Sequence, residues 1–273
     1  MNFDRKVRSL VDLLDDNVVD LLLFDSCALG SELFRHGSPL RLSIEHAERN
    51  NVNMRKLREA RKIAQISTRV LQHEGTGVAP AIYGEQLQKM SVLRRVVDAY
   101  GKKGWHERRE GRTYRKHIMR ERKILGELLA IHNELIGLIG ERIVVDAEEA
   151  QGVENLAIEA YKHLGYNEKP KNDHDERLIG DAVYLATRDG LYVGVVTHDH
   201  RMMPILKRVQ LAVASGNGEA RSIREQLEAG KVIIFRELNP KEGFQIEYCS
   251  SDFKANGQKV PAVVEEKVEA LAL

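Results

Sequence analysis

The sequence predicts an α/β fold with a mainly parallel central sheet, for two reasons. Short apolar runs rich in Val, Leu and Ile alternate with longer segments of helical periodicity along the 273 residues. This alternation is typical of βαβ units. The apolar runs are strand-sized and have no polar face, as expected of strands buried on both sides of a parallel sheet. None is long enough to cross a bilayer, so we expect a protein without a membrane span.

The first elements follow from local patterns. Residues 4–15 place apolar side chains on one helical face, and Val18–Phe24 is a buried strand that ends at Asp25. Helical stretches run from Ser38 to about His73, where Ser38–Pro39 supplies an N-cap and a first helical residue. Residues 78–82 form a short strand or an extended entry into the next helix.

A helical hairpin is predicted over residues 84–140, with an interruption at Gly101–Gly104. Its second half repeats apolar residues at alternating spacings of four and three, which is typical of a heptad seam. These residues are Ile124, Leu128, Ile131, Leu135 and Leu138. We expect the hairpin to pack along this seam or to form a contact between copies of the chain.

The remaining chain continues the alternation. Asp173 and Glu176 have the spacing of a capping box, which predicts that Asp173 caps a helix of about fifteen residues. Strands are expected at 142–145, 192–197, 232–236 and 244–248, and helices at 148–164, 202–214 and 219–229.

Charge is strongly segregated although the net charge is only +1. Residues 101–123 contain ten basic and three acidic side chains, whereas residues 146–176 contain nine acidic side chains and three lysines. Basic arms beside an acidic patch suit a metal-dependent enzyme that acts on a polyanion. Solvated helix faces explain the same pattern equally well. Two cysteines exclude a disulfide framework, and without a secretory signal we expect a cytoplasmic protein.

Four carboxylates are placed at the ends of predicted elements. Asp25 and Asp199 follow strands, Asp175 lies in the first turn of a helix, and Glu85 begins another helix. Ligands bind at the carboxyl ends of parallel strands, so these acids are expected to converge. Oxygen ligands without a histidine or cysteine cluster favour Mg²⁺ or Mn²⁺ over zinc.

At these acids the sequence resembles the PIN domain, a superfamily of metal-dependent nucleases. The resemblance implies a three-layer α/β/α fold and a four-carboxylate site of Asp25, Glu85, Asp175 and Asp199 that coordinates one or two divalent ions. Ser26 and Thr197 would support these ligands. The segments that carry the resemblance are Leu23–Leu29, Val78–Leu87, Asp175–Ile179 with Ala182, and Val195–Asp199.

The chain departs from compact members of that family in two respects. Cys27 stands where the family often has Asn, and 90 positions separate Glu85 from Asp175. We interpret the whole chain, 1–273, as one PIN-like domain with a helical hairpin insertion at 86–140 whose basic tip is 101–123. Asp181 remains an alternative to Asp175 as third acid, and Glu176 is expected to support the site.

The resemblance implies a metal-dependent endoribonuclease in which a metal-polarised water attacks a phosphodiester. The basic tip would hold the RNA backbone, with DNA as an open alternative substrate. Its expected phosphate contacts are Lys102, Lys103, Arg108, Arg109, Arg112, Arg115 and Lys116. The alternative is a catalytically silent RNA-binding or assembly module that uses the same fold and hairpin.

Overall fold

The computed structural model describes residues 10–15, 18–29, 70–106, 112–163, 173–214, 216–239 and 243–254, and positions 264, 268, 269 and 271. The chain divides into two compact units. Unit 1 comprises residues 1–28, 73–82 and 142–273, and unit 2 comprises residues 29–72 and 83–141. The predicted helices between Ser38 and His73 lie almost entirely outside the described residues.

Unit 1 is built on a five-stranded sheet with the order β2-β1-β3-β4-β5. The strands are β1 (Leu21–Phe24), β2 (Thr76–Gly77), β3 (Val193–Thr197), β4 (Val232–Asn239) and β5 (Gly243–Cys249). The first four run parallel, and β5 pairs antiparallel with β4. The mainly parallel α/β fold predicted from the sequence is therefore confirmed.

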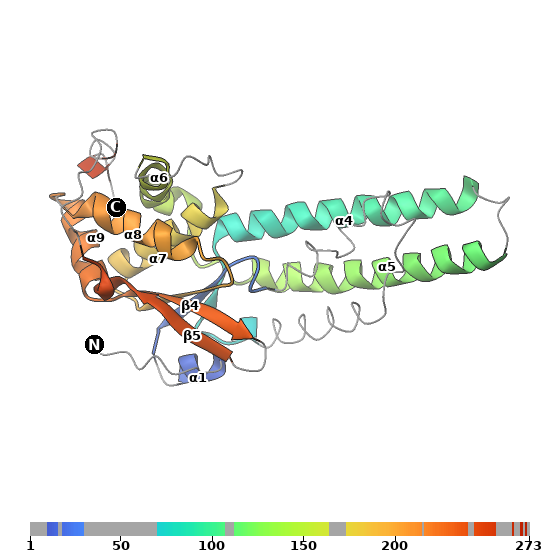
Figure 1. Cartoon of the computed structure of the whole chain (residues 1–273), viewed down its shortest axis with the longest axis horizontal. Helices are drawn as coiled ribbons and strands as arrows, with labels where there is room; N and C mark the ends of the chain where they lie inside the picture. Colours follow the sequence, from blue (N-terminus) through green and yellow to red (C-terminus); the bar gives the residue numbers. More distant parts are fainter. Residues whose placement is uncertain are drawn as a thin grey trace. The chain divides into compact units, whose positions relative to one another are not determined.

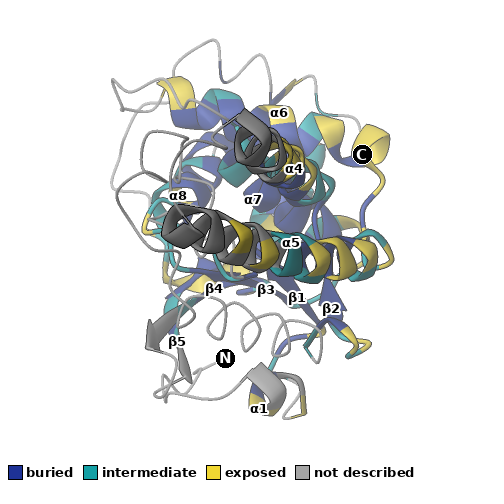
Figure 2. Ribbon diagram, turned by 90° about the vertical axis from the view of Figure 1, so that its right-hand side faces the viewer, coloured by how far each residue is buried: buried dark blue, intermediate teal, exposed yellow. Residues whose placement is uncertain are grey.

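Helices cover the sheet of unit 1 on one face, and α1 (Leu10–Asp15) lies on the other (Figure 1). The covering helices are α6 (Ala147–His163), α7 (His174–Arg188), α8 (Met202–Val213) and α9 (Glu219–Glu228). Buried residues concentrate between this layer and the sheet (Figure 2). A short 3₁₀ turn, η2 (Ser250–Asp252), follows β5.

The core of unit 1 explains why the apolar runs become strands. Leu22, Val195 and Phe235 on three neighbouring strands are completely buried. Gly194 lies between two of them, and a Cβ atom there would approach both Leu22 Cδ2 and Phe235 Cε2 to 2.7 Å. Strands without a polar face are stable here because both faces are covered.

The described part of unit 2 consists mainly of two long helices, α4 (Pro80–His106), which begins in unit 1, and α5 (Arg112–Gly140). They run antiparallel (Figure 1), and Leu93, Leu135 and Ile139 are buried in unit 2. The expected interruption at Gly101–Gly104 is wrong, because α4 continues through both glycines to His106.

Two further local predictions are corrected. Residues 142–145 form no sheet strand, because Ile143 makes only an isolated parallel bridge to Val78. The capping box is also wrong: Asp173 is at the N-cap of α7, but its carboxylate makes no cap hydrogen bond and pairs with Arg177 at 3.1 Å. Among the described helices, none has both the length and the apolarity needed to cross a bilayer.

Candidate carboxylate site

Two of the predicted acids lie at one edge of the sheet because their strands are parallel neighbours. Phe24, the last residue of β1, is in register with Val196 of β3. The backbone N–H of Asp25 then donates to the carbonyl of Val196 at 3.0 Å. Asp199 follows β3 by two residues, so both acids occupy the carboxyl edge of the sheet.

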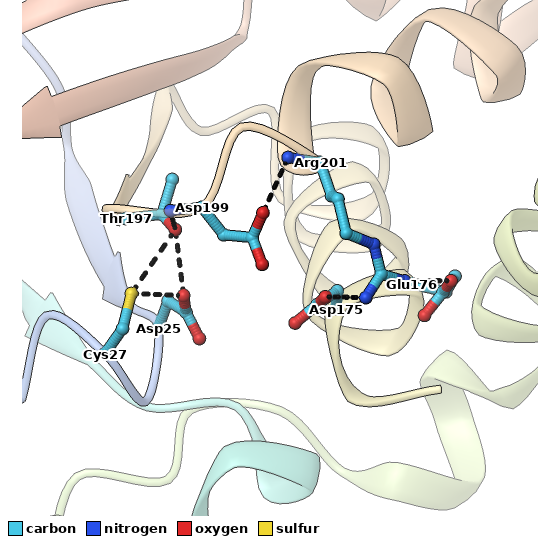
Figure 3. A network of polar contacts seen from close by, with 7 residues as sticks. All are labelled: Asp25, Cys27, Asp175, Glu176, Thr197, Asp199 and Arg201. Carbon is cyan, nitrogen blue, oxygen red and sulfur yellow. Dashed lines mark hydrogen bonds and ion pairs between the residues drawn. The ribbon is translucent and has the colours of Figure 1, made fainter. Parts of the chain in front are cut away.

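Thr197 connects these two acids. Asp25 is 4% exposed, and its Oδ2 accepts hydrogen bonds from Thr197 Oγ1 at 2.8 Å and from Cys27 Sγ at 2.7 Å. The same threonine oxygen accepts the backbone N–H of Asp199 at 2.8 Å. Figure 3 shows this arrangement, in which one hydroxyl fixes the Asp25 carboxylate and the backbone of the Asp199 loop.

The third acid comes from α7. Asp175 lies in the first turn of that helix, where the helix dipole stabilises an anion. Its Oδ2 pairs with Arg201 Nη1 at 3.1 Å, while the other oxygen points to the side of Asp25 and Asp199 (Figure 3). The resemblance-based positions Asp25, Asp175 and Asp199 are thus gathered in unit 1.

The raised pKa of Asp175 reflects its closeness to the other acids. Burial is the largest cause that raises its pKa to about 7, and the charges of Asp25 and Asp199 raise it further, against a lowering effect of Arg201. Acids that repel one another in this way attract a cation. Burial also raises the pKa of the Cys27 thiol well above its usual range, so the thiol is not an activated nucleophile.

Glu176 is buried deeper than Asp175. Its side chain is 0% exposed, Oε1 pairs with Arg201 Nη2 at 3.2 Å, and Oε2 has no hydrogen-bond partner among the described residues. Burial raises the pKa of this carboxyl group. Glu176 therefore holds Arg201 from the interior, which is a supporting position.

Asp181, the alternative third acid, lies against α6 and not with Asp25 and Asp199. Its carboxyl group is fully buried against Glu154 of α6, and neither oxygen accepts a hydrogen bond from a described residue. Glu154 itself pairs with Arg177. Burial and the Glu154 charge raise the pKa of Asp181 to about 9. This geometry favours Asp175 as the acid that faces Asp25.

The other predicted residues have these positions. Ser26 is buried after β1. Glu85 belongs to unit 2, in the second turn of α4, and pairs with Lys89 at 2.6 Å. Of the basic residues expected to bind RNA, Lys102 and Lys103 are in α4, Arg112, Arg115 and Lys116 are in α5, and Arg108 and Arg109 lie outside the described residues.

Sequence patterns missed Arg201, although one signal was present. It stands at the N-cap of α8, and a cation is unfavourable at that end of a helix unless acids surround it. A second group was also missed: Glu247 of β5 lies 3.7 Å from Arg236 and 3.6 Å from His200. Glu247 has no cross-strand partner in the β4–β5 register, so it occupies a β-bulge, and the bulge sets the direction of its side chain.

The donor set suits a hard divalent cation, because the three acids provide only oxygen. Within the described ranges, no three His, Cys, Asp or Glu side chains are already gathered as a ready ion-binding group. One oxygen of Asp25 is occupied by Thr197 and Cys27, and one of Asp175 by Arg201. The second oxygen of Asp175 lies on the side of Asp25 and Asp199 (Figure 3).

Comparisons with protein-family models, with curated proteins and with solved structures found no match for this chain.

Proposed function

We propose that this protein is a metal-dependent ribonuclease with a PIN-like fold. One observation carries the proposal: Asp25, Asp175 and Asp199, from three distant segments of the chain, face one another at the carboxyl edge of a parallel sheet. That edge is where parallel α/β sheets bind ligands.

Mg²⁺ or Mn²⁺ would be held by Asp25, Asp175 and Asp199. Such an ion supplies a water nucleophile at neutral pH and stabilises the charge that develops on phosphate oxygens. The chain's own contribution is to fix a ligand: Thr197 orients Asp25 through a hydrogen bond to its carboxylate. Glu85 joins this set by sequence resemblance alone, since it belongs to unit 2.

RNA is the proposed substrate, and the basic ends of α4 and α5 are its proposed contact. The last two turns of α4 carry Lys102 and Lys103, and the first two turns of α5 carry Arg112, Arg115 and Lys116. Cations of this kind bind phosphates irrespective of base sequence and make affinity depend on salt.

Cleavage of labelled RNA and DNA panels with Mn²⁺, Mg²⁺ or EDTA tests the proposal. We expect metal-dependent cutting of RNA by the wild type and loss of cutting in Asp25→Asn and Asp199→Asn. Asp189→Asn is the matched control, because it makes the same change at an exposed acid that ends α7. Cutting that survives in Asp25→Asn, or that ignores EDTA, would contradict the proposed site.

The RNA contact is tested separately by the salt dependence of binding. Changing Arg112, Arg115 and Lys116 to Glu should weaken RNA affinity and reduce the salt slope by about one for each phosphate that is no longer bound. Arg221→Glu, at an exposed position on α9, controls for a general change of charge. A salt slope equal to that of the wild type would remove these residues from the contact.

The second candidate is a silent RNA-binding or assembly module. It is favoured by the ion pair between Arg201 and Asp175, because that pair neutralises one of the proposed ligands. The two candidates differ in the same assay. Binding of RNA without cutting in any metal would support the silent module.

A further inference from the structure

Arg201 contacts three acidic residues at the site. Its guanidinium pairs with Asp175 at 3.1 Å and with Glu176 at 3.2 Å, and its backbone N–H donates to Asp199 Oδ1 at 2.8 Å. One residue therefore contacts two of the three converging aspartates and the buried glutamate beside them.

The Arg201 guanidinium contacts buried residues on one side and is exposed to solvent on the other. The ring of Tyr161 lies under it, with 5.5 Å between the guanidinium carbon and the ring centroid. Glu176 is fully buried, and Tyr161 is 5% exposed. The Arg201 side chain itself is 40% exposed. Tyr161 and Glu176 can retain Arg201 after it separates from Asp175.

A divalent ion at Asp175 would meet this positive charge at close range. Two cations that share one carboxylate repel each other, and the repulsion is strong where burial lowers the local dielectric. The carboxylate oxygen bound to Arg201 is also blocked for the ion. Metal binding and the Arg201–Asp175 pair are therefore competing states of the same acid.

We propose that Arg201 is an internal counter-ion that occupies Asp175 when no divalent ion is bound, and that it sets the metal affinity of the site by this competition. The inference rests on the proposed metal site. On metal binding the guanidinium releases Asp175 and stays on Glu176 and Tyr161. In the metal-free protein the charge of the acids is therefore already partly neutralised. The site then binds the divalent ion only at a correspondingly higher ion concentration.

Mn²⁺ binding measured by titration calorimetry tests the competition without any cleavage assay. Arg201→Gln removes the charge and should bind Mn²⁺ about tenfold or more tightly than the wild type. Arg201→Lys keeps the charge and should bind Mn²⁺ less tightly than Arg201→Gln. Asp175→Asn should lose affinity, and Arg221→Gln, which removes an exposed arginine of α9, should match the wild type.

A second measurement uses the wild-type chain and does not depend on the folding of Arg201→Gln. The guanidinium N–H resonances of Arg201, assigned by their loss in Arg201→Lys, should be protected in EDTA and should shift or broaden during titration with Mg²⁺.

Three results would overturn the inference. Equal or weaker Mn²⁺ affinity in a folded Arg201→Gln variant would show that Arg201 does not compete with the ion. Arg201 guanidinium resonances that do not change at saturating Mg²⁺ would also show that Arg201 does not compete with the ion. Failure of the wild type and every variant to bind Mn²⁺ would remove the metal site itself, so that the proposed function fails together with this inference.

Discussion

The buried carboxyl pair between α6 and α7 makes stability depend on pH in a direction opposite to that of an ordinary surface acid. Asp181 is fully buried beside Glu154, and its pKa rises from 3.8 in the unfolded chain to about 9 in the folded one. The folded protein thus keeps a proton that the unfolded chain releases. The contribution of the Asp181 carboxyl group to the free energy of unfolding is fully present below pH 3.8, and it is lost as the pH rises through about 9.

The size of the effect follows from one proton. A difference of one bound proton changes the free energy of unfolding by about 1.4 kcal/mol per pH unit. Between pH 7 and 8 the folded state keeps most of that proton, so the contribution of Asp181 to stability falls by roughly 1 kcal/mol. The proposed measurements start at pH 7 because Asp175, whose pKa is raised to about 7, makes stability depend further on pH below that value.

Asp181→Asn removes the titrating group and leaves an amide that can donate to Glu154. Urea unfolding followed by circular dichroism at pH 7.0, 7.5 and 8.0, in EDTA, should show a steeper loss of stability in the wild type than in Asp181→Asn. Asp189→Asn, at an exposed position, should keep the wild-type slope. Identical slopes in the wild type and Asp181→Asn would refute the inference that a proton is held at this pair.

Three further outcomes are expected. Gly180→Ala should cost about 1–3 kcal/mol in urea unfolding, because a Cβ atom there would lie 2.6 Å from Glu154 Cα; a loss below about 0.5 kcal/mol would contradict this close approach. Thr197→Val removes the hydroxyl that donates to Asp25, so cleavage should fall about tenfold or more and return in Thr197→Ser; full activity of the valine variant would exclude this role. Cys27 should resist alkylation at pH 8 until the chain unfolds, because its thiol pKa is raised; labelling of the folded protein at the rate of a free thiol would disprove the burial argument.

Local patterns were sufficient for β1, β3, β4 and β5, but they missed β2 and wrongly predicted a strand at 142–145. The runs that become β1 and β3 are apolar on both faces, and such runs are stable only in a covered parallel sheet. Once those strands are assigned, Asp25 and Asp199 necessarily fall at the same edge. The metal-binding role of these acids remains a prediction.

Two errors concern the interior and the start of helices. Glycines usually weaken a helix by about 1 kcal/mol each relative to alanine, yet α4 continues through Gly101 and Gly104. Asp173 has the residue type and spacing of a cap, but Arg177 one turn later takes its carboxylate. A capping rule cannot anticipate a competing cation on the same helix.

Pairings between elements were the least predictable part. Spacing along α7 could not decide between Asp175 and Asp181, because the answer depends on which face α6 covers. The close approach of Gly180 to the backbone of Glu154 determines that face. The partners of Arg201 likewise come from α7, 25 and 26 residues earlier in the chain.

The sheet order has a consequence for self-association. One edge is β2, a strand of only two residues, and the other is β5, whose pairing with β4 shifts register twice. Short edge strands and bulges are poor templates for an incoming strand. The described sheet edges therefore disfavour both domain swapping by strand exchange and edge-to-edge aggregation.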